Sequence, residues 1–241
     1  MVQLLIFHLV SGDDQRPPRS KPVYIDPRKA PPEFLEPLAS AYLEDVGEYL
    51  QIKQWKQIIW DTEHTLEKIA EASYAEVYRL TETRPIRSEV PETSILKIMR
   101  LKSPEDAESL DCEKAIEVSN VVSEFRILND LTELPGFVIY KAAQLVQGPP
   151  AASCVAAWDE YNRLHNGETE FPDPRGCSDR ALFLVIELAD AGTVLEDYEI
   201  TTVSEAWDIF LGTIMALTRG EEECQFEVSA STSPVFLSSL T

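Results

Sequence analysis

Several kinds of residue and segment are scarce in this 241-residue chain, and each scarcity excludes a class of protein. The chain has only four cysteines and three histidines, and neither type forms the closely spaced pairs that are typical of zinc sites. No apolar run is long enough to span a membrane. Basic residues number 21 against 42 acidic ones, giving a net charge of −21. This charge disfavours direct binding to nucleic acid or to an anionic membrane surface.

The composition that remains is typical of a globular intracellular protein. Hydrophobic residues make up 44% of the chain, which is enough for a sizeable core. Four scattered cysteines indicate a reduced compartment, and the apolar stretch 1–10 lacks the basic start of a signal peptide. The acidic charge suits a basic partner, such as a peptide rich in lysine and arginine, although it also serves solubility.

The order of the expected elements indicates an α+β fold with a mainly antiparallel sheet and one packed helix. Residues 1–33, which include a proline-rich linker, are expected to be flexible. Helical spacing begins at Phe34 and continues to Trp60. Further along, we expect strand–turn–strand over 68–80, a strand over 94–101, an amphipathic helix within 105–131, a strand over 137–146, an irregular segment over 148–179, a buried strand over 181–188, and a helix over 204–218 that Ser204 caps and Gly220 ends.

The stretch "KIAEASYAEVYRL", from Lys68 to Leu80, resembles a phosphate-binding loop between two strands but contains no glycine. Ala70, Ala72 and Ala75 stand where such a loop normally needs glycine. Each added methyl group costs little if φ stays negative, but it limits how closely the backbone can approach phosphates.

Two charged residues extend this pattern to that of a protein-kinase amino-terminal lobe. Lys97 lies in the middle of the apolar strand "SILKIMRL", where a half-buried ammonium group needs a counter-ion. Glu124, at the edge of the apolar face of the following helix, is the candidate. Taken alone, a strand lysine or a helix glutamate is usually a surface residue. The ordered set at compatible spacing is what favours the kinase interpretation.

The residues of several stretches together make the chain similar to one kinase family. The stretches are "KIAEASYAEVYRL", "SILKIMRL", "VVSEFRILNDLTELPGFVIYKAAQLVQGPP", "AAWDEYNR" and "LFLVIELADAGTVLEDYEI". They resemble the haspin family of atypical serine/threonine protein kinases, and the resemblance covers roughly 34–227. It implies a kinase lobe with its preceding helix over 34–190, the hinge exit and first helix of a second lobe over 191–228, and a disordered tail over 229–241.

The resemblance also implies a role for particular residues in an ATP site. Ile69 and Val77 would cover the adenine, Lys97 would bind phosphate, Glu124 would orient Lys97, and Leu188 would occupy the gatekeeper position. Backbone groups of 189–191 would form the hinge. The implied nucleotide-binding residues are Ile69, Ala70, Glu71, Ala72, Ser73, Tyr74, Ala75, Val77, Lys97, Glu124, Leu188, Ala189 and Ala191. The family further implies phosphorylation of a histone tail in the nucleus, and a very acidic protein suits a basic tail.

Departures from the family pattern limit what the chain is expected to do. Val194 stands where the family usually has an aspartate for the ribose, and its side chain cannot accept a hydrogen bond. After Glu227 the sequence has no counterpart of the catalytic loop, of its aspartate or of the metal ligands. We therefore expect no catalytic residue, weak ATP binding, and magnesium carried only by the nucleotide. A truncated gene product, an unspliced intron, a frameshift or a short pseudokinase would each explain this.

Two other interpretations stay open from the sequence. The chain could be a non-catalytic module that uses its folded lobe for protein contacts, or an unrelated acidic interaction protein. In either case the apolar residues of the last helix, Trp207, Phe210, Leu211 and Ile214, could lack a lobe to pack against. Their exposure would favour aggregation or partner binding.

Overall fold

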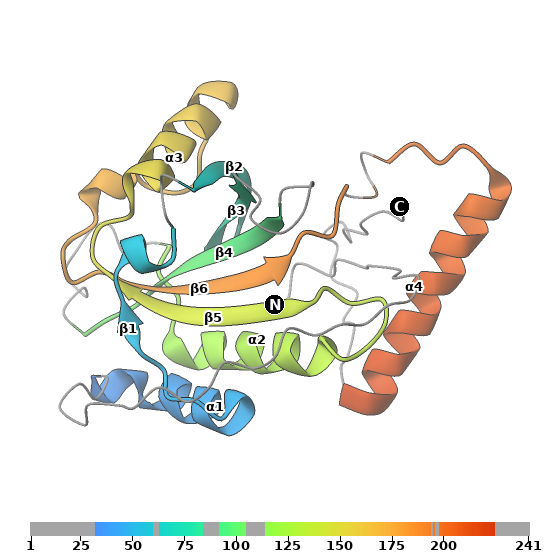
Figure 1. Ribbon diagram of the computed structural model, residues 1–241, viewed down its shortest axis with the longest axis horizontal. Coiled ribbons are helices and arrows are strands. Elements are labelled where there is room, and N and C mark those ends of the chain that lie inside the picture. The colour runs from blue at the N-terminus through green and yellow to red at the C-terminus, as the bar shows by residue number, and fades with distance from the viewer. Residues whose placement is uncertain are drawn as a thin grey trace. The chain divides into compact units, whose positions relative to one another are not determined.

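The computed structural model describes residues 32–59, 63–83, 92–104, 114–193, 195 and 198–224 (Figure 1). These residues form two compact units. The first contains the described parts of 25–123 and of 141–190, and the second contains 124–140 and the described residues from Ala191 onward. Residues 1–31, which make up nearly all of the segment 1–33 that we expect to be flexible, lie outside the described residues. So do residues 225–241, which include the expected disordered tail over 229–241.

A six-stranded sheet forms the centre of the first unit and confirms the expected α+β class. Its strand order is β1-β5-β6-β4-β3-β2. The pairs β2–β3, β3–β4 and β4–β6 are antiparallel, whereas β1 pairs with β5 in parallel. The bounds are β1 (Ile52–Lys53), β2 (His64–Ala72), β3 (Ala75–Glu82), β4 (Thr93–Leu101), β5 (Tyr140–Gln147) and β6 (Leu182–Ala189).

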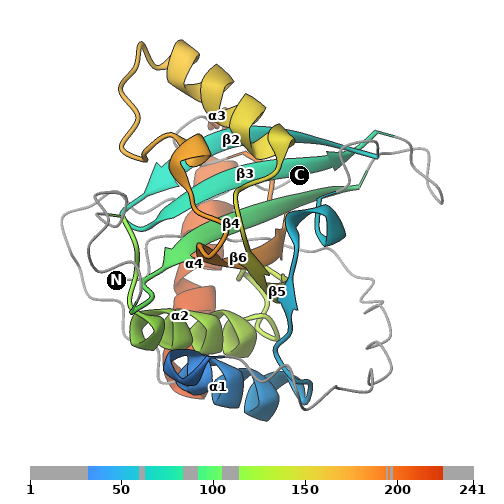
Figure 2. The same ribbon diagram turned by 90° about the vertical axis from the view of Figure 1, so that its left-hand side faces the viewer.

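The two central strands are buried on both faces, which explains their nearly continuous apolar sequences. In β4 only the first residue and Arg100 escape full burial, and in β6 the first five residues are all buried. One face packs against α3 (Ala152–Leu164), which lies over β2 in both views, while α1 (Glu36–Val46) lies on the opposite side of the sheet (Figures 1 and 2). The core on the α3 side joins Tyr78, Leu96 and Phe183 of the sheet with Cys154 and Ala157 of α3.

The prediction of helix from Phe34 to Trp60 is correct only for its first half. A short 3₁₀ turn, η2 (Glu33–Leu35), leads into α1, and α1 ends because Gly47 adopts φ 74° in the left-handed region. The later apolar spacing belongs to a single 3₁₀ turn, η3 (Trp55–Gln57), after β1. There Trp55 is buried, and its indole N–H donates to the carbonyl oxygen of Gly148 at 3.0 Å.

The prediction of an irregular segment over 148–179 is also wrong in part, because 13 of its residues form α3. Cys154, Ala157 and Trp158 of this helix are buried, and the Trp158 indole donates to the carbonyl oxygen of Phe171 at 3.3 Å. A second short turn, η5 (Pro174–Gly176), follows within the same segment. Tertiary packing onto the hairpin, rather than a strong helical pattern, holds this helix in place.

The second unit is helical. It contains the part of α2 (Val118–Leu131) from Glu124 onward, and α4 (Val203–Cys224). Five apolar positions of α2 are expected to face inward, and four of them are buried: Val118, Val121, Phe125 and Leu128. The fifth, Val122, is half-buried. Leu131, Leu134 and Phe137 form a small core with Ala216 of α4.

The last helix differs from expectation at both ends. Its first turn is capped by Thr202, whose hydroxyl accepts a hydrogen bond from the Glu205 amide at 3.2 Å; Ser204 is already inside the helix. Gly220 does not end α4 but lies within it. A Cβ at this position would lie 3.0 Å from the Phe137 ring, so the close packing favours glycine here. The residues that pack inward are therefore the small ones, Ala216 and Gly220, which are buried.

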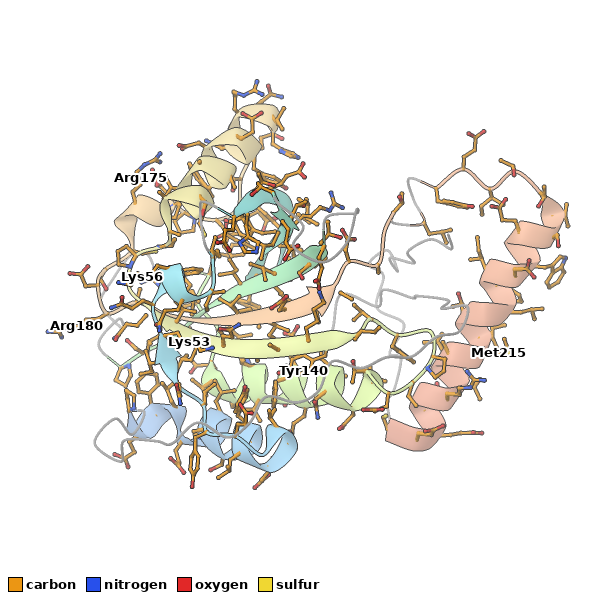
Figure 3. The ribbon with its side chains drawn as sticks, in the orientation of Figure 1. Lys53, Lys56, Tyr140, Arg175, Arg180 and Met215 are labelled. Carbon is orange, nitrogen blue, oxygen red and sulfur yellow. The ribbon has the colours of Figure 1, made fainter. Side chains whose placement is uncertain are left out.

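The large apolar side chains of α4 are exposed, as the sequence leads us to expect. Trp207 is 56% exposed and Phe210 52% exposed, and their rings make an edge-to-face contact. Figure 3 labels Met215, another exposed member of this set. We call the following residues the α4 apolar stripe: Val203, Trp207, Phe210, Leu211, Ile214 and Met215.

We expect the α4 apolar stripe to cause self-association of the purified chain. The double substitution Trp207→Gln with Phe210→Gln keeps good helix formers and removes two aromatic side chains. It should raise the monomer fraction measured by size-exclusion chromatography with light scattering. The control replaces two isolated exposed side chains, Tyr49→Gln with Leu164→Gln, and should change little. A wild-type chain that is already fully monomeric would contradict this expectation.

Candidate nucleotide site

Strand register brings four positions from neighbouring strands into one row across the sheet. Ala70 pairs with Val77, Val77 with Lys97, and Lys97 with Ile186. Directly opposed residues in antiparallel strands point to the same face, so these side chains share a face. The row contains three residues that the sequence assigns to nucleotide binding: Ala70, Val77 and Lys97.

The gatekeeper position and the start of the hinge lie on β6, the strand that contributes Ile186 to this row. Leu188 follows Ile186 by two residues and therefore faces the same side; it is 2% exposed and pairs with Ile95. Ala189 is the last residue of β6. The chain passes from the first unit to the second between Asp190 and Ala191, and Gly192 has φ 88°, a value that favours glycine.

An ion pair fixes the end of β6 to the hairpin. Arg79 of β3 pairs with Ile95 and therefore faces the same side as Lys97. Its Nε donates to Asp190 Oδ2 at 3.1 Å. The Asp190 side chain is mostly covered, so this bond holds the start of the hinge to β3.

Lys97 occupies the centre of the row and is buried, with 8% of its surface exposed. On its own face, Val77, Ile95, Met99 and Ile186 are all at least as well buried. Burial of an ammonium group is costly unless a counter-ion or a charged ligand pairs with it. Glu124 lies in α2 and in the other unit, so the Lys97–Glu124 ion pair stays a prediction.

The hairpin turn that would cover the phosphates consists of Ser73 and Tyr74 between the paired residues Ala72 and Ala75. Ala75 is 1% exposed, whereas Tyr74 is 49% exposed. Neither Ser73 nor Tyr74 has a positive φ. The alanines therefore fit the turn without backbone strain, as expected for methyl groups at negative φ.

A β-bulge at Ile69 changes which side chains share a face of the hairpin. The register shifts between Lys68, which pairs with Tyr78, and Ala70, which pairs with Val77. The inserted residue resets the alternation of side chains, so Lys68 and Glu71, three positions apart, point to the same side. That side is the α3 face, opposite to Lys97, because Tyr78 belongs to the core under α3.

The α3 face of the hairpin carries a buried ionic cluster that sequence reasoning did not find. The Lys68 ammonium donates to Glu71 at 2.7 Å and to Glu76 at 2.5 Å, and its side chain is fully covered. The Tyr78 hydroxyl donates to Glu76 at 2.9 Å. Lysine three residues before glutamate, with another glutamate just after the turn, was the available signal. Only the bulge makes the three side chains meet.

Contacts from α3 and the following loop complete this cluster. The Thr169 hydroxyl and the Glu170 amide both donate to the Glu71 carboxylate, the latter at 2.8 Å. The Lys68 ammonium lies 4.9 Å from the Tyr161 ring centre and 5.4 Å from that of Phe171, within the range of cation–π attraction. We call these residues the brace cluster: Lys68, Glu71, Glu76 and Tyr78 of the hairpin, with Tyr161, Thr169, Glu170 and Phe171.

Burial and hydrogen bonds act in opposite directions on the brace cluster carboxylate. Burial raises the pKa of Glu71, but bonds from Lys68, Thr169 and the Glu170 amide lower that pKa to below its usual value. The lowered pKa stabilises the fold at neutral pH, and this contribution is lost as the pH falls through the folded-state pKa. Burial first, and then the Glu76 charge, raise the pKa of Tyr78, so its hydroxyl stays a donor.

A cavity of about 820 Å³ lies elsewhere, between β1, η3 and the start of α3. Lys53 and Lys56 line it (Figure 3), and the Lys53 ammonium donates to Gln144 at 2.8 Å. Trp55 also lines it and belongs to the core on the α3 face. The cavity is therefore separate from the row that contains Lys97.

Two further kinds of feature, a metal site and a membrane span, have no candidate among the described residues. Among the described residues, no group of three or more histidine, cysteine or acidic side chains could hold a metal ion. None of the helices in the described ranges has the length and apolar character that a membrane span requires. Val194, at the position of the ribose aspartate, lies outside the described residues.

The hairpin, the buried strand lysine, the gatekeeper strand and the hinge define a protein-kinase-like amino-terminal lobe. A family model described as "Haspin like kinase domain" matches residues 38–229. The chain belongs to this family of haspin-like kinases, as the resemblance implied. Protein kinases as a class use ATP with a metal ion and act on a protein substrate. It excludes the third interpretation, an unrelated acidic protein.

Two curated relatives agree with this assignment. The chain is 28% identical over 168 residues to the serine/threonine-protein kinase haspin homolog of Drosophila melanogaster. The matched region covers 66% of this chain and 29% of the relative. The chain is 25% identical over 173 residues to the serine/threonine-protein kinase haspin homolog hrk1 of Schizosaccharomyces pombe, covering 72% of this chain and 32% of the relative. The chain thus matches about a third of the length of these relatives.

Proposed function

We propose that this lobe binds Mg-ATP on the Lys97 face of the sheet, as the nucleotide-binding part of a haspin-type serine/threonine kinase. The observation that carries the proposal is the row Ala70–Val77–Lys97–Ile186, with the buried ammonium at its centre. A buried lysine can contribute a charge-assisted hydrogen bond to a phosphate oxygen. The backbone of 189–191 would contact the adenine, and Ile69 and Val77 would cover it.

The protein substrate that fits this lobe is a basic histone tail, encountered in the nucleus. The net charge of −21 supports attraction to a lysine- and arginine-rich peptide. Phosphoryl transfer needs a base near the substrate hydroxyl and ligands for magnesium. The 241 residues contain no stretch that resembles the catalytic loop. We therefore expect the polypeptide to bind nucleotide without transferring phosphate by itself.

Two measurements on the purified chain test the two parts of this proposal. Mg-ATP should raise the melting temperature, because a ligand that binds only the folded state stabilises it. Incubation of the chain with radiolabelled Mg-ATP and a histone-tail peptide should give no labelled peptide above a protein-free control. Labelling that Lys97→Met abolishes would contradict the second part, and no thermal shift at millimolar Mg-ATP would contradict the first.

The α4 apolar stripe favours one alternative, a pseudokinase or other non-catalytic module that binds a protein through its folded lobe. Exposed apolar side chains of this size are typical of interaction surfaces. This alternative predicts that partner binding survives Lys97→Met but is lost in the Trp207→Gln, Phe210→Gln double variant. A pull-down with both variants separates it from nucleotide-dependent function.

A further inference from the structure

The turn at Ser73–Tyr74 is a connection that needs support from outside the hairpin. Two-residue hairpin loops usually take positive φ values, because the resulting turn matches the right-handed twist of the strands. Neither residue of this turn has a positive φ. With negative φ values, a turn of this length splays its strands, and the sequence provides no glycine to relieve the mismatch.

The base of the same turn carries a repulsive pair. Glu71 and Glu76 are directly paired across β2 and β3, next to the Ala72–Ala75 pair that closes the turn. Like charges at opposed positions destabilise a hairpin. The Lys68 ammonium lies between the two carboxylates and contacts both. It converts a repulsion that would open the turn into a bridge between the two strands.

The bridge is attached to a part of the chain almost a hundred residues away. Glu71 accepts one hydrogen bond from the Thr169 hydroxyl and one from the Glu170 amide. The Tyr161 and Phe171 rings cover the Lys68 ammonium. A further ion pair, Lys114 to Glu170 at 2.6 Å, holds the same loop. The carboxylate at the base of the turn is thus held from the hairpin and from the loop after α3.

We infer that the brace cluster positions the Ser73–Tyr74 turn for contact with the nucleotide phosphates, taking over the role that glycine-dependent turn geometry has elsewhere. This inference rests on the proposed nucleotide site. The brace cluster lies on the α3 face and the phosphates would lie on the Lys97 face. Lys68, Glu71 and Thr169 are therefore positioning residues whose side chains act through the turn. For Glu71, which the resemblance places among the nucleotide-binding residues, this inference gives the side chain a supporting role instead.

Thr169→Val tests the inference with the least damage, because it removes one hydroxyl donor and keeps the shape of the side chain. Thr169→Ser keeps the hydroxyl and should retain the Mg-ATP affinity and the amide exchange rates of the wild-type chain. Glu71→Gln is a second variant, which removes the charge that Lys68, Thr169 and the Glu170 amide share. The matched control is Glu160→Gln, which breaks an exposed pair with Arg163 on α3, 2.6 Å long.

Two readouts distinguish positioning from general stability. Thr169→Val and Glu71→Gln should weaken Mg-ATP binding roughly fivefold to tenfold, the usual effect of losing one or two hydrogen bonds. Adenosine lacks phosphates and so cannot contact the turn through them. Its affinity for every variant should therefore stay within about twofold of the wild-type value, a change smaller than the loss of one typical hydrogen bond. In the ligand-free protein, amide hydrogen exchange at 72–75 should accelerate in both variants and stay unchanged in Thr169→Ser and Glu160→Gln.

The possible outcomes decide between the inference and its alternatives. Faster exchange at the turn with a loss confined to Mg-ATP supports the brace role. Unchanged exchange and unchanged Mg-ATP affinity in both variants overturn it, as does an equal loss of ATP and adenosine binding. A wild-type chain that binds no nucleotide would count against the proposed function instead, and the exchange comparison would then decide alone whether the brace cluster holds the turn.

Discussion

Replacing Lys97 by methionine is expected to remove most of the thermal stabilisation that Mg-ATP gives the wild-type chain. The ammonium is the only cationic group in the Ala70–Ile186 row. A hydrogen bond to a charged group contributes about 1.5–3 kcal/mol, so its loss should weaken nucleotide binding roughly tenfold to a hundredfold. Methionine keeps the buried aliphatic stem, so the fold should survive.

The thermal shift is measured for each variant against its own ligand-free melting temperature, because the substitution also changes the stability of the empty protein. Lys102→Met is the matched control. Lys102 follows β4, its side chain is 45% exposed, and it forms an ion pair with Glu117 at 3.0 Å. Its replacement should leave the Mg-ATP shift intact. An equal shift in wild type and Lys97→Met would disprove the assignment of Lys97 as the phosphate-binding lysine.

Trp55→Ala is expected to cause the largest loss of stability among the substitutions considered. The indole is 5% exposed, meets the Phe183 ring edge-to-face at 5.3 Å between centres, and donates to the Gly148 carbonyl oxygen. Replacing a buried aromatic by alanine typically costs about 3–5 kcal/mol. Here the Gly148 carbonyl oxygen also loses its donor, which adds to the cost.

Urea unfolding followed by circular dichroism measures this loss without depending on tryptophan fluorescence. Trp207→Ala provides the control, since Trp207 is 56% exposed on α4 and surface substitutions usually change stability by less than about 0.5 kcal/mol. Similar midpoints for Trp55→Ala and wild type would show that η3 is not part of the core of the first unit.

Much of the fold could be predicted because its elements have strong local signals. The strand β6 was placed within one residue of its observed bounds, and the amphipathic helix expected within 105–131 is α2, which occupies the second half of that range. The helix α3 was missed since its pattern is weak and its stability comes from packing on β2. The apolar spacing that begins at Trp55 led to a wrong prediction of helix, because apolar residues at i, i+3 and i+4 also occur around a single 3₁₀ turn.

The candidate site divides in the same way. The shared face of Val77, Lys97 and Leu188 could be predicted from the sequence, because strand alternation and order decide which face each residue occupies. Their binding of nucleotide stays a prediction. The brace cluster could not, because a bulge at Ile69 reverses the alternation between Lys68 and Glu71. No local sequence rule places such a bulge, and Thr169 comes from a distant loop.

Local patterns and matched motifs were sufficient to identify the kinase family, the two strands of the hairpin and the buried lysine. The support for a hairpin turn without glycine became clear only from the folded chain. That support joins residues almost a hundred positions apart. It also depends on the bulge at Ile69, which brings Lys68, Glu71 and Glu76 to one face of the hairpin.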